Sequence, residues 1–149
     1  MYDYLMTLDF RGKRVLIVGC GFGEDALRIA MLGAEVYAFD LSPECLNIAR
    51  QLAAREGIRV HFAQMPAEEL SYDDNFFDYV VAPNILHHVD IPLAIREINR
   101  VAKSGAMLIV DEIYSHTFTK FNTKVQTSRM PVSKGAKIHI WQAKSLHHC

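Results

Sequence analysis

The stretch VLIVGCGFG, Val15–Gly23, decides the fold. Its four apolar residues predict a short buried strand, and its three alternating glycines predict a turn in which the backbone can approach a ligand and take positive φ. A helix is expected over Glu24–Leu32, followed by a strand over Glu35–Phe39 that ends at Asp40. This order of strand, glycine turn, helix, strand and acid predicts a βαβ nucleotide site, in which Asp40 accepts hydrogen bonds from ribose hydroxyls.

The spacing of the glycines argues against a dinucleotide. Counted from Gly19 and Gly21, the G-x-G-x-x-G/A fingerprint requires a small residue where this chain has Glu24. Glu24 and Asp25 begin the helix, and carboxylates at that position would repel a pyrophosphate. A cationic nucleoside without phosphate fits better, and S-adenosylmethionine, with its sulfonium, has this chemistry. An NAD-dependent dehydrogenase stays open as an alternative.

The chain from Lys13 to Ile113 resembles class I S-adenosylmethionine-dependent methyltransferases of the methyltransferase type 11 kind. The resemblance is carried, in chain order, by VLIVGCGFG (15–23), VYAFDLSPECLNIAR (36–50), AEEL (67–70), FFDYVVAPNILHHV (76–89) and GAMLIVDEI (105–113). It implies an α/β fold with a Rossmann-like, doubly wound, mostly parallel sheet, and an enzyme that transfers a methyl group to a small-molecule acceptor. A second reading is a cofactor-binding domain with little or no catalysis, because Pro66 and Ile17 stand where relatives often carry acids.

The resemblance also implies which residues contact the cofactor. They lie in the glycine turn and after the second, third and fourth predicted strands: Gly19, Cys20, Gly21, Gly23, Asp40, Leu41, Ala67, Glu68 and Asn84. Leu41 could pack on the adenine or fill the core. His87 is the candidate catalytic base if the acceptor must lose a proton, because histidine titrates near neutral pH. One ring of the His87–His88 pair could instead bond the backbone near Asp90.

The remaining pattern alternates strands with helices. We expect a helix capped by Ser42 and ended by Gly57, strands at 58–63 and 77–82, a helix over 91–103 capped by Asp90 and closed by Gly105, and a strand at 106–112. Alternation of this kind implies parallel pairing and right-handed crossovers. Ligands bind such sheets at the carboxyl ends of the strands, near the point where the strand order reverses.

Composition favours one globular domain. The 149 residues suffice for a single core, half of them are apolar, and the formal net charge is −1. No apolar run approaches the ~20 residues of a membrane span, and the N-terminus lacks the basic start of a signal peptide. Cys20, Cys45 and Cys149 form an odd set without metal-binding spacing. We therefore expect a cytoplasmic protein without a metal.

The C-terminal part differs in charge from the rest. All 17 acidic residues lie within residues 1–112, whereas 6 of the 16 basic residues follow Glu112. We expect residues 1–113 to form the S-adenosylmethionine-binding domain. Residues 114–149 then form a basic extension with one helix, from the spacing of Phe118, Phe121 and Val125, and one strand at Ile138–Trp141.

This extension is shorter than the helix and two strands that follow the fifth strand in relatives. The sheet is therefore expected to be incomplete, through truncation or a divergent end, and an unpaired edge could support a homodimer. The basic residues could fold against the acidic body, form a disordered end, or contact nucleic acid. Nucleic acid is not favoured, because Gly-Arg repeats and interleaved aromatic residues are missing.

Overall fold

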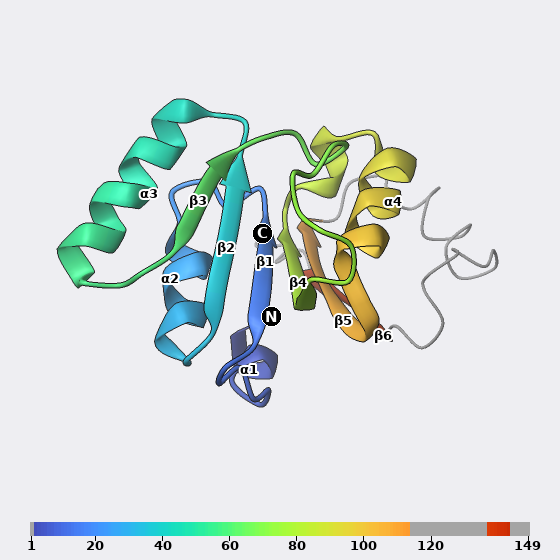
Figure 1. Cartoon of the computed structure of the whole chain (residues 1–149), viewed down its shortest axis with the longest axis horizontal. Helices are drawn as coiled ribbons and strands as arrows, with labels where there is room; N and C mark the ends of the chain where they lie inside the picture. The colour runs from blue at the N-terminus through green and yellow to red at the C-terminus, as the bar shows by residue number, and fades with distance from the viewer. Residues whose placement is uncertain (1, 114–136, 144–149) are drawn as a thin grey trace, which may run out of the picture.

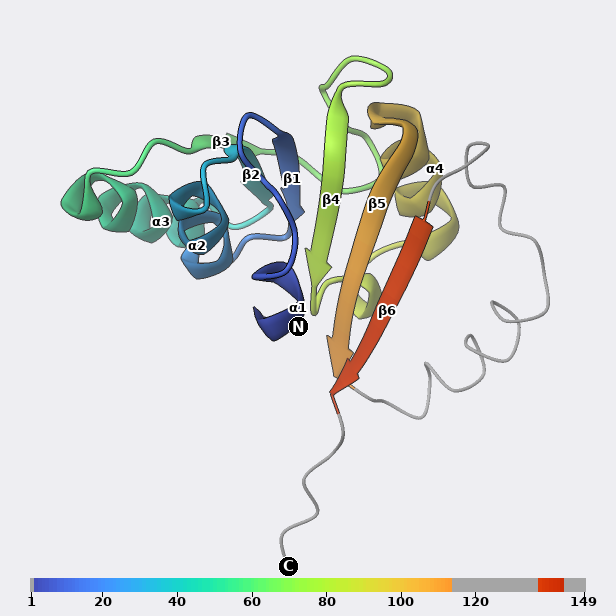
Figure 2. The same cartoon turned by 90° about the horizontal axis from the view of Figure 1, so that it is seen from below.

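Six parallel strands form one sheet in the computed structural model, which describes residues 2–113 and 137–143. Their order across the sheet is β3-β2-β1-β4-β5-β6 (Figures 1 and 2). The strands are β1 (Arg14–Val18), β2 (Glu35–Asp40), β3 (His61–Gln64), β4 (Phe77–Pro83), β5 (Ala102–Ile113) and β6 (Lys137–Ala143). The helices are α1 (Tyr2–Leu5), α2 (Glu24–Met31), α3 (Pro43–Glu56), the 3₁₀ turn η1 (Leu86–His88) and α4 (Ile91–Val101). The strand order reverses between β1 and β4, so the predicted Rossmann-like, doubly wound fold is confirmed.

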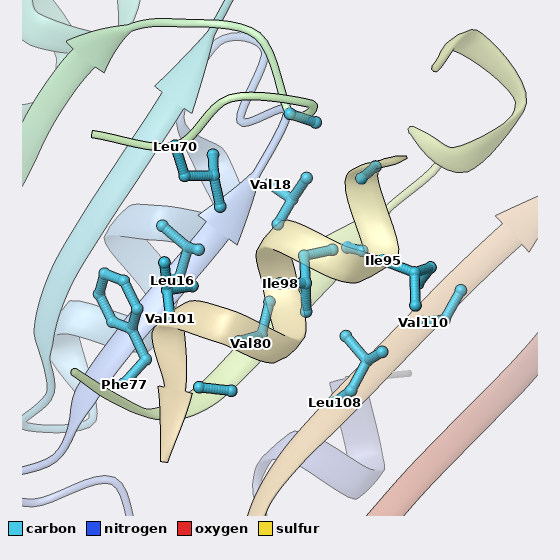
Figure 3. Close-up of a cluster of buried hydrophobic side chains, with 14 of the residues drawn as sticks. Leu16, Val18, Leu70, Phe77, Val80, Ile95, Ile98, Val101, Leu108 and Val110 are labelled. Carbon is cyan, nitrogen blue, oxygen red and sulfur yellow. The ribbon is translucent and has the colours of Figure 1, made fainter. Parts of the chain in front are cut away.

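β1 lies inside the sheet and is buried on both of its faces. Leu16 and Val18 belong to the cluster of apolar side chains under α4, which Figure 3 shows packed against the sheet through residues such as Ile98. Val15 and Ile17 point the other way, into a second cluster that includes residues of α1, α2 and α3. Helices on both faces explain why four consecutive residues of this strand are apolar.

The helix ends follow the predicted caps. The Ser42 hydroxyl accepts the Cys45 N–H at 3.1 Å, and the Asp90 carboxylate accepts the Leu93 N–H at 3.1 Å. Gly57 ends α3 in the left-handed region with φ +66°. These caps fix where α3 begins, shortly after β2, and where α4 begins, after β4 and η1.

β3 is shorter than predicted. The strand was expected over 58–63, but β3 begins at His61. The Ile58 N–H donates to the Ala53 carbonyl at 2.9 Å, so this residue completes the end of α3 rather than a ladder with β2.

The prediction for the junction of α4 and β5 was wrong. α4 ends at Val101, not Lys103, and β5 begins at once with Ala102, which pairs with Phe77 of β4. Gly105 does not close the helix. It lies inside β5 with φ +79°, where the register shifts between the Phe77 and Tyr79 pairings. A glycine at such a bulge keeps the strand continuous.

The C-terminal strand predicted at Ile138–Trp141 is confirmed as part of β6, which pairs in parallel with β5 from Met107 to Ile113. The helix predicted from Phe118, Phe121 and Val125 lies outside the described residues. The division into residues 1–113 and 114–149 stays a prediction. No helix in the described part of the chain has the length and apolar character needed to cross a membrane.

Tyr72 carries a buried hydroxyl that has no hydrogen-bond partner among the described residues. Its ring meets the rings of Tyr37 and Phe77 edge to face, with centroids 5.9 and 5.1 Å apart, and burial raises the pKa of its phenol to about 12. Because an unsatisfied buried polar group costs free energy, Tyr72→Phe is expected to raise the free energy of unfolding by roughly 1 kcal/mol in urea denaturation.

The matched control is Tyr37→Phe, which removes an exposed hydroxyl that donates to Glu35 at 2.8 Å and is expected to change stability little. A clear loss of stability in Tyr72→Phe would show that this hydroxyl is satisfied in solution.

Candidate functional site

A cleft of about 370 Å³ lies at the carboxyl ends of β1, β2 and β4, where the strand order reverses. Its size is that of a small-molecule site. Its lining residues come from four segments that are distant in sequence: Gly19, Gly21, Phe39, Asp40, Leu41, Met65, Ala67, Asn84, Ile85, His88 and Val89. The cleft therefore stands at the edge where the sequence predicted a ligand.

The glycine turn forms one wall of the cleft. Gly19, Gly21 and Gly23 all have positive φ, at +68°, +51° and +86°. A Cβ on Gly19 would lie 2.6 Å from two side-chain carbons of Ile85, whereas a Cβ on Gly21 would meet nothing within 4 Å. Gly23 does not line the cleft, and a Cβ there would lie 2.8 Å from the Cβ of Ala49. The first two glycines thus bring backbone to the cleft, and the third lets α2 begin close to α3.

Asp40 joins the glycine turn to the start of α3. Its half-buried carboxylate accepts the Gly21 N–H at 2.8 Å through one oxygen and the Ser42 N–H at 2.9 Å through the other. A carboxylate oxygen has two lone pairs, so both oxygens keep acceptor capacity for a ligand. The carboxylate lines the cleft, and its position is fixed by two backbone donors.

The other predicted contacts divide into two groups. Leu41, Ala67 and Asn84 line the cleft; Leu41 is 62% exposed, and Asn84 has φ +50° while its N–H donates to the Asp111 carbonyl at 2.6 Å. The Glu68 side chain does not line it, since its carboxylate accepts the Asp90 N–H at 2.8 Å. A non-glycine residue in the left-handed region, as at Asn84, is common at functional turns.

Cys20 lies behind the glycine turn rather than in the cleft. Its side chain is buried in the second core cluster, and its N–H donates to the Phe39 carbonyl at 2.8 Å. Burial raises the pKa of its thiol to about 12, so it supplies no thiolate at neutral pH.

The two histidines after β4 lie next to each other, with ring centroids 3.9 Å apart and both side chains exposed. His88 lines the cleft and His87, the predicted catalytic residue, does not. The turn η1 therefore brings the second histidine, not the first, to the wall.

Sequence reasoning missed four lining residues, Phe39, Met65, Ile85 and Val89, and it chose His87 over His88 as the candidate base. Phe39 and Met65 stand beside the ends of β2 and β3, so their strand-end positions could have indicated them. Ile85 and Val89 flank η1, and no local pattern reveals how that turn folds back over Gly19.

The described residues contain no group of three or more His, Cys, Asp or Glu side chains that could hold a metal ion. The residues that line the cleft offer a ligand the Asp40 carboxylate, the glycine backbone and apolar walls. Together with the parallel sheet, this arrangement defines a Rossmann-like domain with a ligand-sized cleft at its strand ends.

Residues 16–110 match the family model described as a methyltransferase domain, so the chain belongs to the methyltransferase-domain family. The predicted resemblance is thereby confirmed.

Curated relatives carry the name ubiquinone biosynthesis O-methyltransferase. The one from Xanthomonas oryzae pv. oryzae (strain PXO99A) is 37% identical over 114 residues, which are 74% of this chain and 48% of the relative. The one from Cereibacter sphaeroides (strain ATCC 17025 / ATH 2.4.3) is 27% identical over 146 residues, 97% of this chain and 56% of the relative. The chain thus spans about half the length of these curated relatives.

Solved structures agree on the fold. The YcgJ protein from Bacillus subtilis superposes with a TM-score of 0.71 at 26% identity, covering 91% of this chain and 61% of that one. The [4+2]-cyclase SpnF gives a TM-score of 0.66 at 38% identity, covering 71% of this chain and 41% of that one. An S-adenosylmethionine-dependent methyltransferase from Mesorhizobium loti gives a TM-score of 0.62 at 26% identity. The match covers 70% of this chain and 50% of that one.

Proposed function

We propose that the cleft binds S-adenosylmethionine and that the protein transfers its methyl group to a small-molecule acceptor. The observation that carries this proposal is the Asp40 carboxylate at the cleft wall, fixed by the N–H groups of Gly21 and Ser42. Its free lone pairs suit the two hydroxyls of a ribose. Gly19 and Gly21 would run along the methionine and ribose portion, and Leu41 and Ala67 would border the adenine.

The charges around the cleft favour a cationic ligand. Asp40 lines the cleft, and Glu24 and Asp25 occupy the first turn of α2 next to the glycine turn. These carboxylates would attract a sulfonium and repel the pyrophosphate of NAD. The cofactor, when bound, would supply an electrophilic methyl group on sulfur.

The protein's own part in the reaction is alignment and exclusion of water. The residues that line the cleft would hold the acceptor atom next to the methyl group that the bound cofactor would supply. Phe39, Met65, Ile85 and Val89 make the walls apolar, which keeps water from the reacting atoms. The names of the curated relatives favour an oxygen atom as the acceptor, and a hydroxyl acceptor must lose its proton.

A histidine beside the cleft would take that proton. The sequence assigns this role to His87, but His88 is the one that lines the cleft. We expect His88→Gln to lower kcat by roughly 100-fold with a hydroxyl acceptor, because general-base catalysis is worth about that much. His87→Gln is the matched control and should stay within about 3-fold, on the order expected for a side chain outside the reaction geometry. A larger loss of kcat in His87→Gln than in His88→Gln would instead support His87 as the base.

A second candidate is a domain that binds the cofactor without methyl transfer. SpnF, a [4+2]-cyclase, is 38% identical over the aligned part, so proteins of this fold also carry other activities. In this chain position 17 holds a buried isoleucine and position 66, directly before Ala67, holds a proline. Neither Ile17 nor Pro66 therefore supplies a carboxylate to the cleft.

Calorimetric titration with S-adenosylmethionine, S-adenosylhomocysteine and NAD, followed by turnover with methyl-labelled cofactor and a panel of phenols and catechols, separates these functions. We expect binding of the first two ligands and label transfer to at least one hydroxyl acceptor. Binding without transfer would favour the second candidate, and binding of NAD alone would favour a dehydrogenase.

The remaining expectations about partners and place in the cell stay proposals. A small-molecule acceptor is consistent with the cleft's size and apolar walls. Only the sequence suggests a homodimer and a cytoplasmic location, and size-exclusion chromatography with light scattering would test the first of these.

A further inference from the structure

The segment 65–76, between β3 and β4, forms part of the cleft although it contains no helix or strand. Met65 and Ala67, at its beginning, line the cleft. The rest of the segment runs along α4 and meets the end of that helix. The position of one cleft wall therefore depends on what holds this segment in place.

Arg100, in the last turn of α4, donates three hydrogen bonds to the segment. Its Nη1 donates to the Tyr72 carbonyl and to the Asp74 carboxylate, both at 2.8 Å. Its Nη2 donates to the Leu70 carbonyl at 2.8 Å. Only the planar, forked donor set of a guanidinium can serve acceptors in so many directions at once.

Glu97 completes the arrangement one turn earlier on the same helix. Its carboxylate accepts from Arg100 Nε at 2.9 Å and Nη2 at 2.8 Å, and also accepts the Leu70 N–H at 2.9 Å. The bond to Arg100 lowers the pKa of Glu97 to about 2, so the carboxylate is charged throughout the neutral range. Both backbone groups of Leu70 are thus bonded to side chains of α4.

The backbone at the end of α4 binds the same segment. The N–H groups of Asn75 and Phe76 donate to the carbonyls of Arg100 and Val101, at 3.0 and 2.7 Å. These carbonyls belong to the last turn of a helix, where partners inside the helix are missing. The segment therefore caps α4 while α4 anchors the segment.

Leu70 is the point nearest to the cleft at which Arg100 and Glu97 hold the segment. Its side chain is buried in the cluster under α4, where Figure 3 draws it, and its N–H and C=O are held by Glu97 and Arg100. Ala67, which lines the cleft, precedes it by only three residues, and Glu68 between them bonds the Asp90 N–H at the start of α4. Only Glu68 and Glu69 separate Leu70 from Ala67, so a displacement of Leu70 would act on the cleft wall through a short stretch of chain.

We propose that Arg100 and Glu97 form a clamp that positions the Met65–Ala67 wall for cofactor binding, without touching the cofactor. The proposal rests on the proposed function, because it takes the cofactor to lie against that wall. Without the clamp, the segment would have to be ordered at the moment of binding, and that ordering would reduce affinity. Arg100 is then a positioning residue for this site.

The test uses Glu97→Gln and Arg100→Lys in the full chain. Glutamine cannot offer two charged oxygens to the guanidinium and the Leu70 N–H, and lysine cannot reach three acceptors at once. Both variants are expected to raise the dissociation constant for S-adenosylhomocysteine by about tenfold, measured by calorimetry. In the ligand-free protein, hydrogen exchange at the amides of Leu70, Asn75 and Phe76 should become faster.

Asp78→Asn is the control, since it disrupts a second charged pair close to the end of α4 without removing a bond to the segment 65–76. Asp78 accepts the Lys103 ammonium at 2.8 Å and the Arg14 N–H at 2.9 Å, and none of these residues lines the cleft. This variant should lower the melting temperature about as much as Glu97→Gln, yet leave the dissociation constant within about 2-fold, because it removes none of the hydrogen bonds that hold the segment 65–76.

The outcomes separate the two proposals. If exchange of the three amides does not change in Glu97→Gln and Arg100→Lys, the clamp does not exist, whatever the ligand data show. If exchange becomes faster and affinity does not change, or if Asp78→Asn loses affinity equally, the positioning role is refuted. If the unmodified protein binds neither S-adenosylmethionine nor S-adenosylhomocysteine, the proposed function itself fails and the positioning role with it.

Discussion

Replacing Asp40 with asparagine is expected to raise the dissociation constant for S-adenosylhomocysteine by roughly 10- to 100-fold, because hydrogen bonds to a charged group contribute about 1.5–3 kcal/mol. The side chain keeps its size, but one acceptor oxygen becomes an NH₂ group. That group would face a backbone donor, either Gly21 N–H or Ser42 N–H, both of which now bond the carboxylate. The variant therefore has two defects: the ribose loses a charged hydrogen-bond partner, and a backbone donor that positions the side chain is left without its acceptor. Isothermal titration calorimetry measures the change.

Glu44→Gln is the matched control for Asp40→Asn. Glu44 is an exposed carboxylate in the first turn of α3 that accepts the Ser42 hydroxyl at 3.0 Å and does not line the cleft. Its replacement removes the same charge from the same helix start, so affinity should stay within about 2-fold, as surface charges contribute little. Equal losses in the two variants would mean that Asp40 acts only through the overall charge of this region.

Replacing Gly19 with alanine is expected to lower the free energy of unfolding by roughly 2–5 kcal/mol. A residue with a Cβ at φ +68° costs about 1–2 kcal/mol, and overpacking against a neighbour adds about 1–3 kcal/mol. The clash here is with Ile85, whose Cδ1 and Cγ1 would both lie 2.6 Å from the new carbon and whose Cβ would lie at 3.1 Å. Because Ile85 is β-branched, its side chain has few rotamers in which to move away. Urea denaturation measures the loss.

Two further variants separate the clash from the backbone strain. Gly21→Ala places a Cβ at φ +51° with nothing within 4 Å, so only the strain of about 1–2 kcal/mol is expected. In the double variant Gly19→Ala/Ile85→Ala the two contacts at 2.6 Å are removed and only the Cβ contact at 3.1 Å is kept, so the effect of Gly19→Ala in this background should shrink towards the value for Gly21→Ala. If Gly19→Ala is no less stable than Gly21→Ala, the Ile85 side chain does not lie against Gly19 as the structure places it.

Elements with strong local signals could be predicted from the sequence. The strand in VLIVGCGFG, the glycine turn and Asp40 each follow from residue types at fixed offsets, and the caps Ser42 and Asp90 follow from a polar side chain before a helical pattern. Since the carboxyl ends of parallel strands meet at one edge, the order of elements also predicted where the cleft lies.

Features that depend on contacts across the fold could not be predicted. Gly105 was read as a helix end because glycine is common there, but the pairing of Ala102 with Phe77 extends β5 past it. Nothing local to Arg100 indicates that it bonds Leu70 and Tyr72, about thirty residues earlier in the chain. The choice between His87 and His88 depends on the direction of one short 3₁₀ turn, which the sequence does not specify.

The most direct test is a crystal structure of the protein with bound S-adenosylhomocysteine. We expect both ribose hydroxyls within hydrogen-bond distance of the Asp40 carboxylate, with the homocysteine portion along Gly19 and Gly21 and the adenine beside Leu41 and Ala67. An adenosine bound elsewhere, or an Asp40 carboxylate turned into solvent, would contradict the proposed site.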